Sequence, residues 1–197
     1  MKNIIPEDTR YVPLTQQSYC CVPTCISMVM YKLDIPLIPQ ELLGFHLGLV
    51  LNKKDKNLFW NARTGKKPKT GYGTQMGKKQ FEINLIFKKL KIPLKVTACL
   101  IKNFKTKKEL ISYISSSVKK DKNLIVLLRS GVLNNTDSMN GHACVIDRIY
   151  PAKDIIRLID PSAKQAKWRE FKIDKFIKAV KLHPTGEGRF LEFEKIR

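Results

Sequence analysis

Residues 15–33, TQQSYCCVPTCISMVMYKL, form the segment on which the fold depends. From Cys21 onward this segment is apolar on nearly every side, which predicts a helix that is buried all round. Pro23 falls in the expected first turn, where its missing N–H costs nothing. The thiol of Cys21 therefore stands at the amino end of a central helix, where free N–H groups and the helix dipole favour negative charge.

That position suits a nucleophile, because a thiol attacks only as the thiolate. Cys20 precedes it by one residue and is expected to point elsewhere, so Cys21 is the preferred candidate. Gln16 lies five positions before Cys21, and its amide is a candidate donor for an oxyanion hole beside the backbone N–H of Cys21. Gln17 stays open as the alternative donor, for use with Cys20 or with a different turn shape.

Two later runs, 142–150 and 154–160, have the composition of strands joined by a short turn. His142 opens the first run directly after a glycine, and Asp160 ends the second directly before a proline. An imidazole at this place is the candidate general base, and a carboxylate at a strand end is the candidate group that orients it.

The register of this hairpin decides whether the two groups meet. Pairing Tyr150 with Asp154 places Cys144 opposite Asp160 and makes His142 a diagonal neighbour of Asp160, at about 7–8 Å between Cα atoms. A slip of one residue would put the imidazole and the carboxylate on opposite faces.

The remaining pattern predicts helices in the first half of the chain and strands in the second. Thr106 with Glu109 forms a capping box at the start of one helix. The further predicted helices cover about 39–47, 80–90, 106–118 and 173–180, and the further predicted strands cover 93–101, 123–129 and 189–194. This is an α+β layout with a twisted antiparallel sheet, and we expect residues 1–197 to form one domain.

The quoted residues resemble the motifs of papain-like cysteine peptidases, and most closely the bacteriocin-processing leader peptidases (family thirty-nine of the cysteine peptidases) with their standalone relatives. The first family motif reads Gln, a short spacer and Cys-Gly-Pro-Ala, and here the chain has Cys21-Val22-Pro23-Thr24. The second reads Gly-His, an aliphatic strand and Asp-Pro, which the chain matches at 141–145 and 160–161. Val22 in place of glycine and a Gln spacing one residue short are departures from the family.

The resemblance implies a papain-like cysteine peptidase fold, with a central buried helix packed on a twisted antiparallel sheet. It implies Cys21, His142, Asp160 and Gln16 as catalytic residues of a two-step acyl-enzyme mechanism that uses no metal or cofactor. The implied substrate is a peptide or protein.

The charge is strongly positive, at +20, and is unevenly placed. Residues 52–107 hold 16 basic and 2 acidic residues, which gives +14 of the total. Lysines outnumber arginines by 29 to 8, and specific phosphate clamps usually prefer arginine, so nucleic-acid binding is not expected. Residues 52–79, polar and basic, predict a loop insertion that either borders a cleft or decorates the surface.

Apart from Cys21 and His142, the five cysteines and three histidines offer few candidates for a disulfide, a metal site or a second catalytic site. An odd number of cysteines without a signal peptide argues against a disulfide framework, and the spacing of the cysteines is not that of a zinc site. No run is long enough to span a membrane. Residues 1–8 are too polar for a secretory signal, so a cytoplasmic location is the default, with signal-free export left open. His46 and His183 are expected to be structural or surface residues.

Three functions remain open for a chain with these residues. The first is a cysteine peptidase or close amidohydrolase, and the second is a transglutaminase-like acyltransferase that differs only in accepting an amine. The third is a catalytically inactive, peptidase-like binding protein that uses its basic segment, 52–107, on nucleic acid or an acidic partner.

Overall fold

A computed structural model describes residues 6–55, 65–162, 164 and 166–196. The predicted insertion 52–79 therefore lies partly outside the described residues. None of the helices in these ranges is long and apolar enough to cross a bilayer. The expectation of a single domain over 1–197 stays a prediction.

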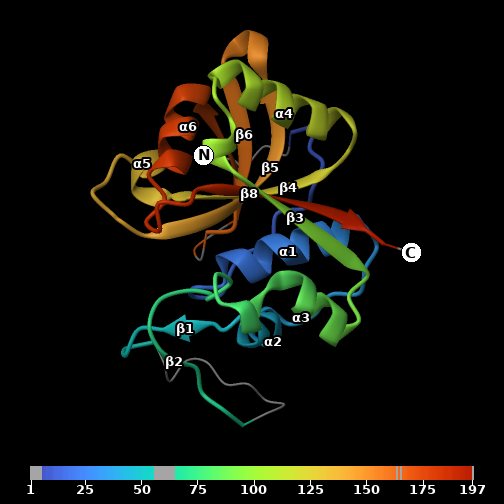
Figure 1. The fold of residues 1–197 in the computed structure, drawn as a ribbon, viewed down its shortest axis with the longest axis vertical. Helices are drawn as coiled ribbons and strands as arrows, with labels where there is room; N and C mark the ends of the chain where they lie inside the picture. Colours follow the sequence, from blue (N-terminus) through green and yellow to red (C-terminus); the bar gives the residue numbers. More distant parts are fainter. Residues whose placement is uncertain (1–5, 56–64, 163, 165, 197) are drawn as a thin grey trace.

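A six-stranded antiparallel sheet forms the centre of the fold (Figure 1). Its strands, in spatial order, are β3 (Leu94–Leu100), β8 (Arg189–Lys195), β4 (Asn123–Arg129), β5 (Gly141–Tyr150), β6 (Ile155–Asp160) and β7 (Lys167–Lys172). Two short parallel strands, β1 (Val50–Leu51) and β2 (Lys69–Thr70), pair separately. The predicted strands are therefore present, and β1, β2 and β7 are strands that were not predicted.

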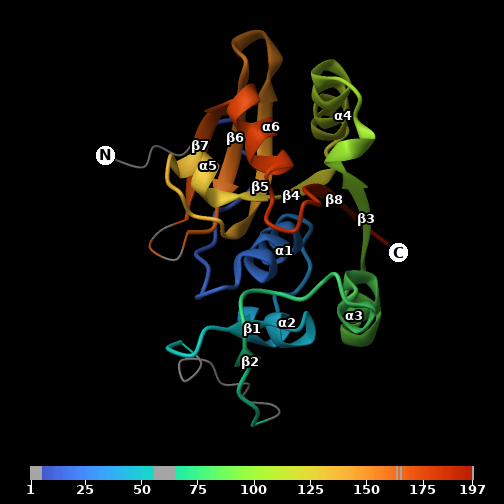
Figure 2. The same cartoon turned by 60° about the vertical axis from the view of Figure 1, so that its left-hand side comes forward.

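Helices flank the sheet in two groups, as Figures 1 and 2 show. The first group contains α1 (Cys21–Lys32), α2 (Gln40–His46) and α3 (Ile83–Leu90). The second contains α4 (Lys107–Lys119), α5 (Ser130–Asn134) and α6 (Ile173–Lys181). Short 3-10 turns are η2 (Lys79–Phe81), η3 (Ile101–Asn103) and η4 (Pro151–Lys153).

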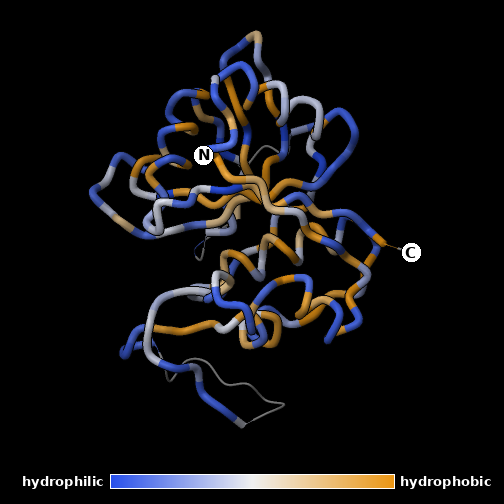
Figure 3. Tube along the Cα trace, viewed as in Figure 1, coloured by the Kyte–Doolittle hydropathy of each residue, from blue (hydrophilic) through white to orange (hydrophobic). Residues whose placement is uncertain are grey.

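Strand β4 shows why the sheet is buried on both faces. Ile125 and Leu127 belong to the core that α1 and α3 share, whereas Leu124, Val126 and Leu128 belong to the core of α4 and α6. Because side chains alternate along a strand, a strand covered on both faces is apolar throughout, which explains the unbroken run in this strand. The apolar tube segments of Figure 3 accordingly meet at α1 and along the middle of the sheet.

Helix α1 is buried as its composition predicts, and every residue from Val22 to Met30 is shielded from solvent. It packs mainly on β5 and α2. Helix α2 ends just before Gly48, which has φ +70° and an adjacent Phe81 ring where a side chain would otherwise lie. The predicted cap at Thr106 is present, since its hydroxyl accepts the Glu109 N–H at 3.1 Å.

The β5–β6 hairpin differs from its predicted register at the turn. Tyr150 pairs with Ile155 and not with Asp154, which is a shift of one residue. A β-bulge between Ile146 and Arg148 then restores the predicted phase, so that Val145 pairs with Ile159. Continued by one residue, this register sets Cys144 opposite Asp160, as the alternation of the two strands predicts. The predicted turn pairing is wrong because it did not include a bulge.

The bulged residue, Asp147, is fully buried and joins three parts of the chain. Its carboxylate accepts the Arg157 Nε–H at 2.7 Å and the Arg10 backbone N–H at 2.7 Å. Arg157 also pairs with Asp8 at 2.7 Å. This network fastens the segment that leads to the first motif across β5 and β6, and it satisfies a buried charge that would otherwise be costly.

Candidate functional site

Cys21 is the first residue of α1, and it lies at the bottom of a cavity of about 950 Å³. The N–H of Val22 and the N–H of Ala143 both donate hydrogen bonds to its sulfur, and its thiol also contacts His142. Burial acts to raise the pKa of Cys21, but the contact with His142 and these N–H groups outweigh it, and the pKa is lowered from the ordinary value. The helix amino end supplies one of these donors, Val22, and strand β5 supplies the other, Ala143, and together they stabilise a thiolate.

Cys20 is placed differently from its neighbour. It is fully buried in a small cluster with Leu49 and Leu51, away from the cavity. Burial raises the pKa of Cys20 to about 12. A thiol in that environment stays protonated near neutral pH and is inert. The two neighbouring cysteines therefore have different environments: Cys21, the first residue of α1, faces the cavity, and Cys20 points away from it.

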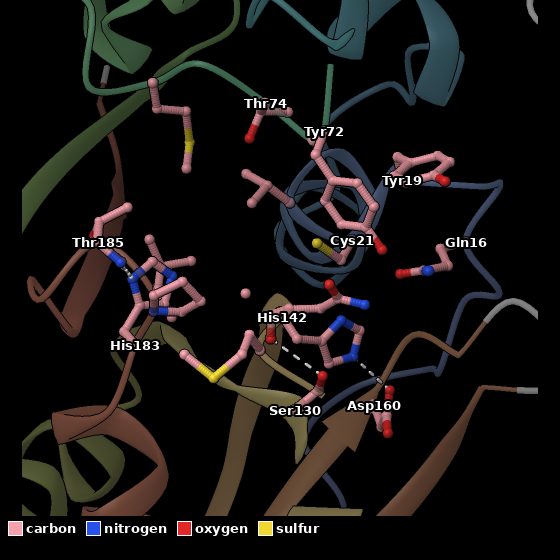
Figure 4. Close-up of a pocket in the computed structure, with 18 of the residues that line it drawn as sticks. Gln16, Tyr19, Cys21, Tyr72, Thr74, Ser130, His142, Asp160, His183 and Thr185 are labelled. Atoms are coloured by element: carbon pink, nitrogen blue, oxygen red, sulfur yellow. Dashed lines mark hydrogen bonds and ion pairs between the residues drawn. The ribbon is translucent and has the colours of Figure 1, made fainter. Parts of the chain in front are cut away.

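His142 stands between the thiol and a carboxylate. Its Nε2 lies 2.8 Å from Asp160 Oδ1. Figure 4 shows the second ring nitrogen turned toward Cys21. The structure therefore brings together the three residues that lie 121 and 18 positions apart in the sequence.

Asp160 has a second partner that was not predicted. Arg169, on β7, donates from Nη1 to Asp160 Oδ2 at 2.7 Å. Burial would raise the pKa of Asp160, but the hydrogen bond from His142 and the Arg169 guanidinium lower it to about 2. The carboxylate is thus ionised at neutral pH, with each of its oxygens held by one partner.

The pKa of His142 is well above its ordinary value. Burial favours the neutral ring, but contacts with the thiols of Cys144 and Cys21 and with the Asp160 carboxylate outweigh it. With the pKa of Cys21 lowered and that of His142 raised, the thiol and the imidazole favour a thiolate–imidazolium pair.

Gln16 reaches the same cavity from the segment before α1. Its backbone N–H donates to the Pro161 carbonyl at 2.9 Å, which places it directly beside Asp160. Its side-chain Oε1 is buried and has no hydrogen-bond partner among the described residues. Gln17 is exposed and does not line the cavity, so of the two glutamines only Gln16 lies at the site.

The wall of the cavity opposite the sheet comes from the basic segment. Tyr72 packs edge-on against Tyr19 with ring centroids 4.7 Å apart, and Figure 4 shows its ring over Cys21. Tyr19 has φ +65°, and its hydroxyl donates to Asp55 at 2.9 Å. The described part of the predicted insertion therefore borders the cleft, which was one of its two expected places.

One group among the described residues has ligand atoms close enough to hold a metal ion. His142, Cys144 and Asp160 each offer one such atom within 4.8 Å of the others. In this structure Asp160 is already engaged by His142 and by Arg169, and a guanidinium at this place opposes the binding of a cation. The arrangement is more readily explained as the support of the imidazole.

Two residues of the cleft were missed or expected elsewhere from the sequence. Arg169 follows from the unpredicted β7, whose register pairs Asp160 with Lys167 and Leu158 with Arg169. The alternating run 167–172 after a turn is the signal that predicts such a strand. His183 was expected to be structural or on the surface, whereas it lines the cavity together with Cys21 and His142.

Comparison with solved structures identifies the architecture. A crystal structure of a Bacillus anthracis protein, assigned provisionally as a C39-like peptidase, superposes with a TM-score of 0.58 over 96% of this chain and 98% of the other. The chain has the fold of a C39-like peptidase. The two sequences are 15% identical, so the likeness concerns the fold.

The C39-like fold confirms the predicted fold class of a buried central helix on an antiparallel sheet. No protein-family model matches the chain, and neither does any curated protein sequence. The case for a chemical role therefore depends on the residues in the cleft.

Proposed function

We propose that the protein is a thiol hydrolase that cleaves peptide or amide bonds through an acyl-enzyme. The single observation that carries the proposal is the imidazole of His142, held at 2.8 Å by Asp160 and contacted by the Cys21 thiol on its other side. A nucleophile, a base and an orienting carboxylate in this order are the parts that acyl transfer needs.

In the first step the Cys21 thiolate attacks the carbonyl carbon of the scissile bond. His142, as the imidazolium, then donates its proton to the departing amine, which leaves a thioester on Cys21. In the second step neutral His142 takes a proton from water, and the hydroxide attacks the thioester and releases the acid. Asp160 keeps the ring in place and stabilises its charged form throughout.

The negative charge of each tetrahedral intermediate needs donors at the amino end of α1. We assign this task to the backbone N–H of Cys21 and the side-chain amide of Gln16. The unpartnered Oε1 of Gln16 supports an adaptable amide, because a half-turn about its last torsion exchanges the oxygen for the NH₂ group. In that orientation the NH₂ group donates to the oxyanion, and the carbonyl oxygen of Gln16 turns toward other donors.

The cavity supports a peptide-sized substrate. At about 950 Å³ it is at the upper end of the range of ordinary ligand sites, about 300–1,000 Å³. The loop that carries Tyr72 covers Cys21, and His183 and Gln16 lie on either side of it (Figure 4).

The test is labelling with an electrophilic thiol reagent, followed by peptide mapping and by turnover of a peptide pool. We expect modification at Cys21 at neutral pH and none at Cys20, because only the former has a lowered pKa. Cys21→Ala should abolish turnover, whereas the matched variant Cys20→Ala should leave it within about threefold, since its thiol lies away from the cavity.

Three outcomes would change the proposal. Turnover that survives Cys21→Ala removes the thiol from the mechanism. Products that carry an added amine in place of water would make the protein an acyltransferase with the same residues. Salt-sensitive binding of an acidic partner, without turnover or labelling, would favour an inactive binding protein.

A further inference from the structure

A second histidine belongs to the cleft. His183 lies between α6 and β8, is half-buried, and lines the same cavity as Cys21 and His142. Figure 4 shows its ring on the side of the cavity opposite Gln16. The proposed hydrolysis does not use this imidazole.

Gly141 has no side chain and so leaves room for the His183 ring. A Cβ atom at Gly141 would lie 3.1 Å from His183 Nε2, which is tighter than an ordinary contact, and 3.7 Å from Cε1. The imidazole therefore packs against the backbone of the residue that immediately precedes His142.

The contacts of Nδ1 determine which ring nitrogen carries the proton. The backbone N–H of Thr185 donates to His183 Nδ1 at 3.4 Å, and the Thr185 hydroxyl lies 2.9 Å from the same atom. A nitrogen that accepts an N–H is unprotonated, so the neutral ring holds its proton on Nε2. Burial, with a smaller effect of the Arg189 charge, lowers the pKa of His183 and favours this neutral form.

The Nε2–H group of His183 is thus a donor at the cleft, and it makes no hydrogen bond within the described ranges of the chain. Arg189, on β8, lines the same part of the cavity and adds a cation. Its guanidinium pairs with Glu187, which lines the cavity as well. The Arg189 side chain is 25% exposed and the Glu187 side chain 54%, so the cation is the more inward member of the pair. Ser130 and Asn134 complete a polar lining.

The geometry points to a subsite, formed by His183 and backed by Arg189, that binds an acidic side chain of the substrate one or two residues from the scissile bond. This inference rests on the proposed function and names a class of substrate for it. A carboxylate offers acceptors to both the imidazole N–H and the guanidinium. A lysine at that place meets the like charge of Arg189 and a donor on His183, and the one carboxylate near it, Glu187, is already paired with Arg189.

The experiment compares peptides that are identical except for Glu, Gln or Lys at each position beside the scissile bond. At one position we expect kcat/KM for Glu to exceed that for Lys by about tenfold or more, the size of one charge-assisted hydrogen bond. His183→Ala should reduce this ratio to about twofold, and His183→Gln, which keeps a donor, should retain part of it. His46→Ala, which alters a histidine outside the cavity, is the matched control.

Binding of the same peptides to the Cys21→Ala variant gives a second readout that does not require turnover. The Glu peptide should bind this variant more tightly than the Lys peptide, and His183→Ala in the same background should remove the difference. Equal affinities, no binding, or a preference that survives His183→Ala would overturn the subsite while leaving cleavage by Cys21 intact. Failure of the hydrolase itself would appear separately, as an unlabelled Cys21.

Discussion

The two sides of the cleft are held by different forces. On the sheet side, Asp160 is hydrogen-bonded to His142 at 2.8 Å and to Arg169 at 2.7 Å. Asp160 is buried and His142 is nearly so. On the helix side, Cys21 depends on the packing of α1, and Gln16 has a side-chain oxygen without a partner among the described residues. In the mechanism that we propose, the first side is a preformed base and the second an adaptable oxyanion site, whose last contacts are made by the substrate.

The largest effect on turnover after Cys21→Ala should come from the preformed side. His142→Ala removes the base and the partner that stabilises the thiolate, and we expect kcat to fall by about 10⁴-fold. The rate of Cys21 alkylation at pH 7 should fall as well, because the pKa of Cys21 then rises. A normal alkylation rate in this variant would contradict the thiolate–imidazolium pair.

On the adaptable side, Gln16→Ala should lower kcat by about 10²-fold, the usual cost of one oxyanion donor. KM should change little, because the interaction forms only in the transition state. Gln17→Ala is the matched control and should behave as wild type, since its side chain lies outside the cavity. An equal loss in both variants would mean that the segment before α1 matters only for folding.

Arg169→Met tests whether the base side depends on its outer partner. We expect about tenfold lower turnover, from the loss of one charge-assisted hydrogen bond, and partial recovery in Arg169→Lys.

The pKa of Asp160 also links this carboxylate to stability. Asp160 has a pKa of about 2 against an ordinary 3.8, so it adds about 2 kcal/mol of stability above pH 4, which is lost as the pH falls to about 2.

Without Arg169 the pKa of Asp160 moves back toward its ordinary value, so this contribution shrinks at neutral pH. The free energy of unfolding should then depend less steeply on pH between 4 and 2 than in the wild type. Denaturant titrations at several pH values measure this slope. An unchanged slope would show that Arg169 does not act through Asp160.

The smallest effect on turnover should come from a residue remote from the cleft. Asp147→Asn removes the buried ionic partner of Arg157 and leaves it only the half-exposed Asp8, and we expect the free energy of unfolding to fall by about 3 kcal/mol. Asp8→Asn, at a half-exposed partner of the same arginine, should cost less than about 1 kcal/mol. Turnover of the folded protein should change by about threefold or less in both.

The sequence predicts the inner elements well because burial leaves a strong pattern. An apolar run at 21–33 and another at 123–129 have few alternatives to a buried helix and a buried strand. The meeting of His142 with Asp160 was also predictable, since period-two alternation determines which residues share a face. The pairing of Tyr150 was not, because a bulge depends on the burial of one ion pair, Asp147 with Arg157, between distant residues.

The outer parts of the site, around Arg169 and His183, have weaker sequence patterns. Arg169 lies on a half-exposed strand of mixed charge, and its role follows only from the diagonal position it occupies beside Asp160. His183 reaches the cleft through the return of the chain after α6, which no local pattern encodes. Such contacts are set by topology, and a single sequence does not record them.

The bulge at Asp147 adds one residue to β5 that has no partner on β6. Loss of its codon would leave a regular ladder in which Ile146 still pairs with Leu158, so the imidazole would keep its place beside the carboxylate. That loss would instead remove the anchor of Arg157 and of the Arg10 N–H. A codon lost between His142 and Ile146 has a different fate, because it moves His142 by one position and turns its ring to the other face. Cleavage should therefore survive a deletion at the bulge, at a cost in stability, and not a deletion nearer the cleft.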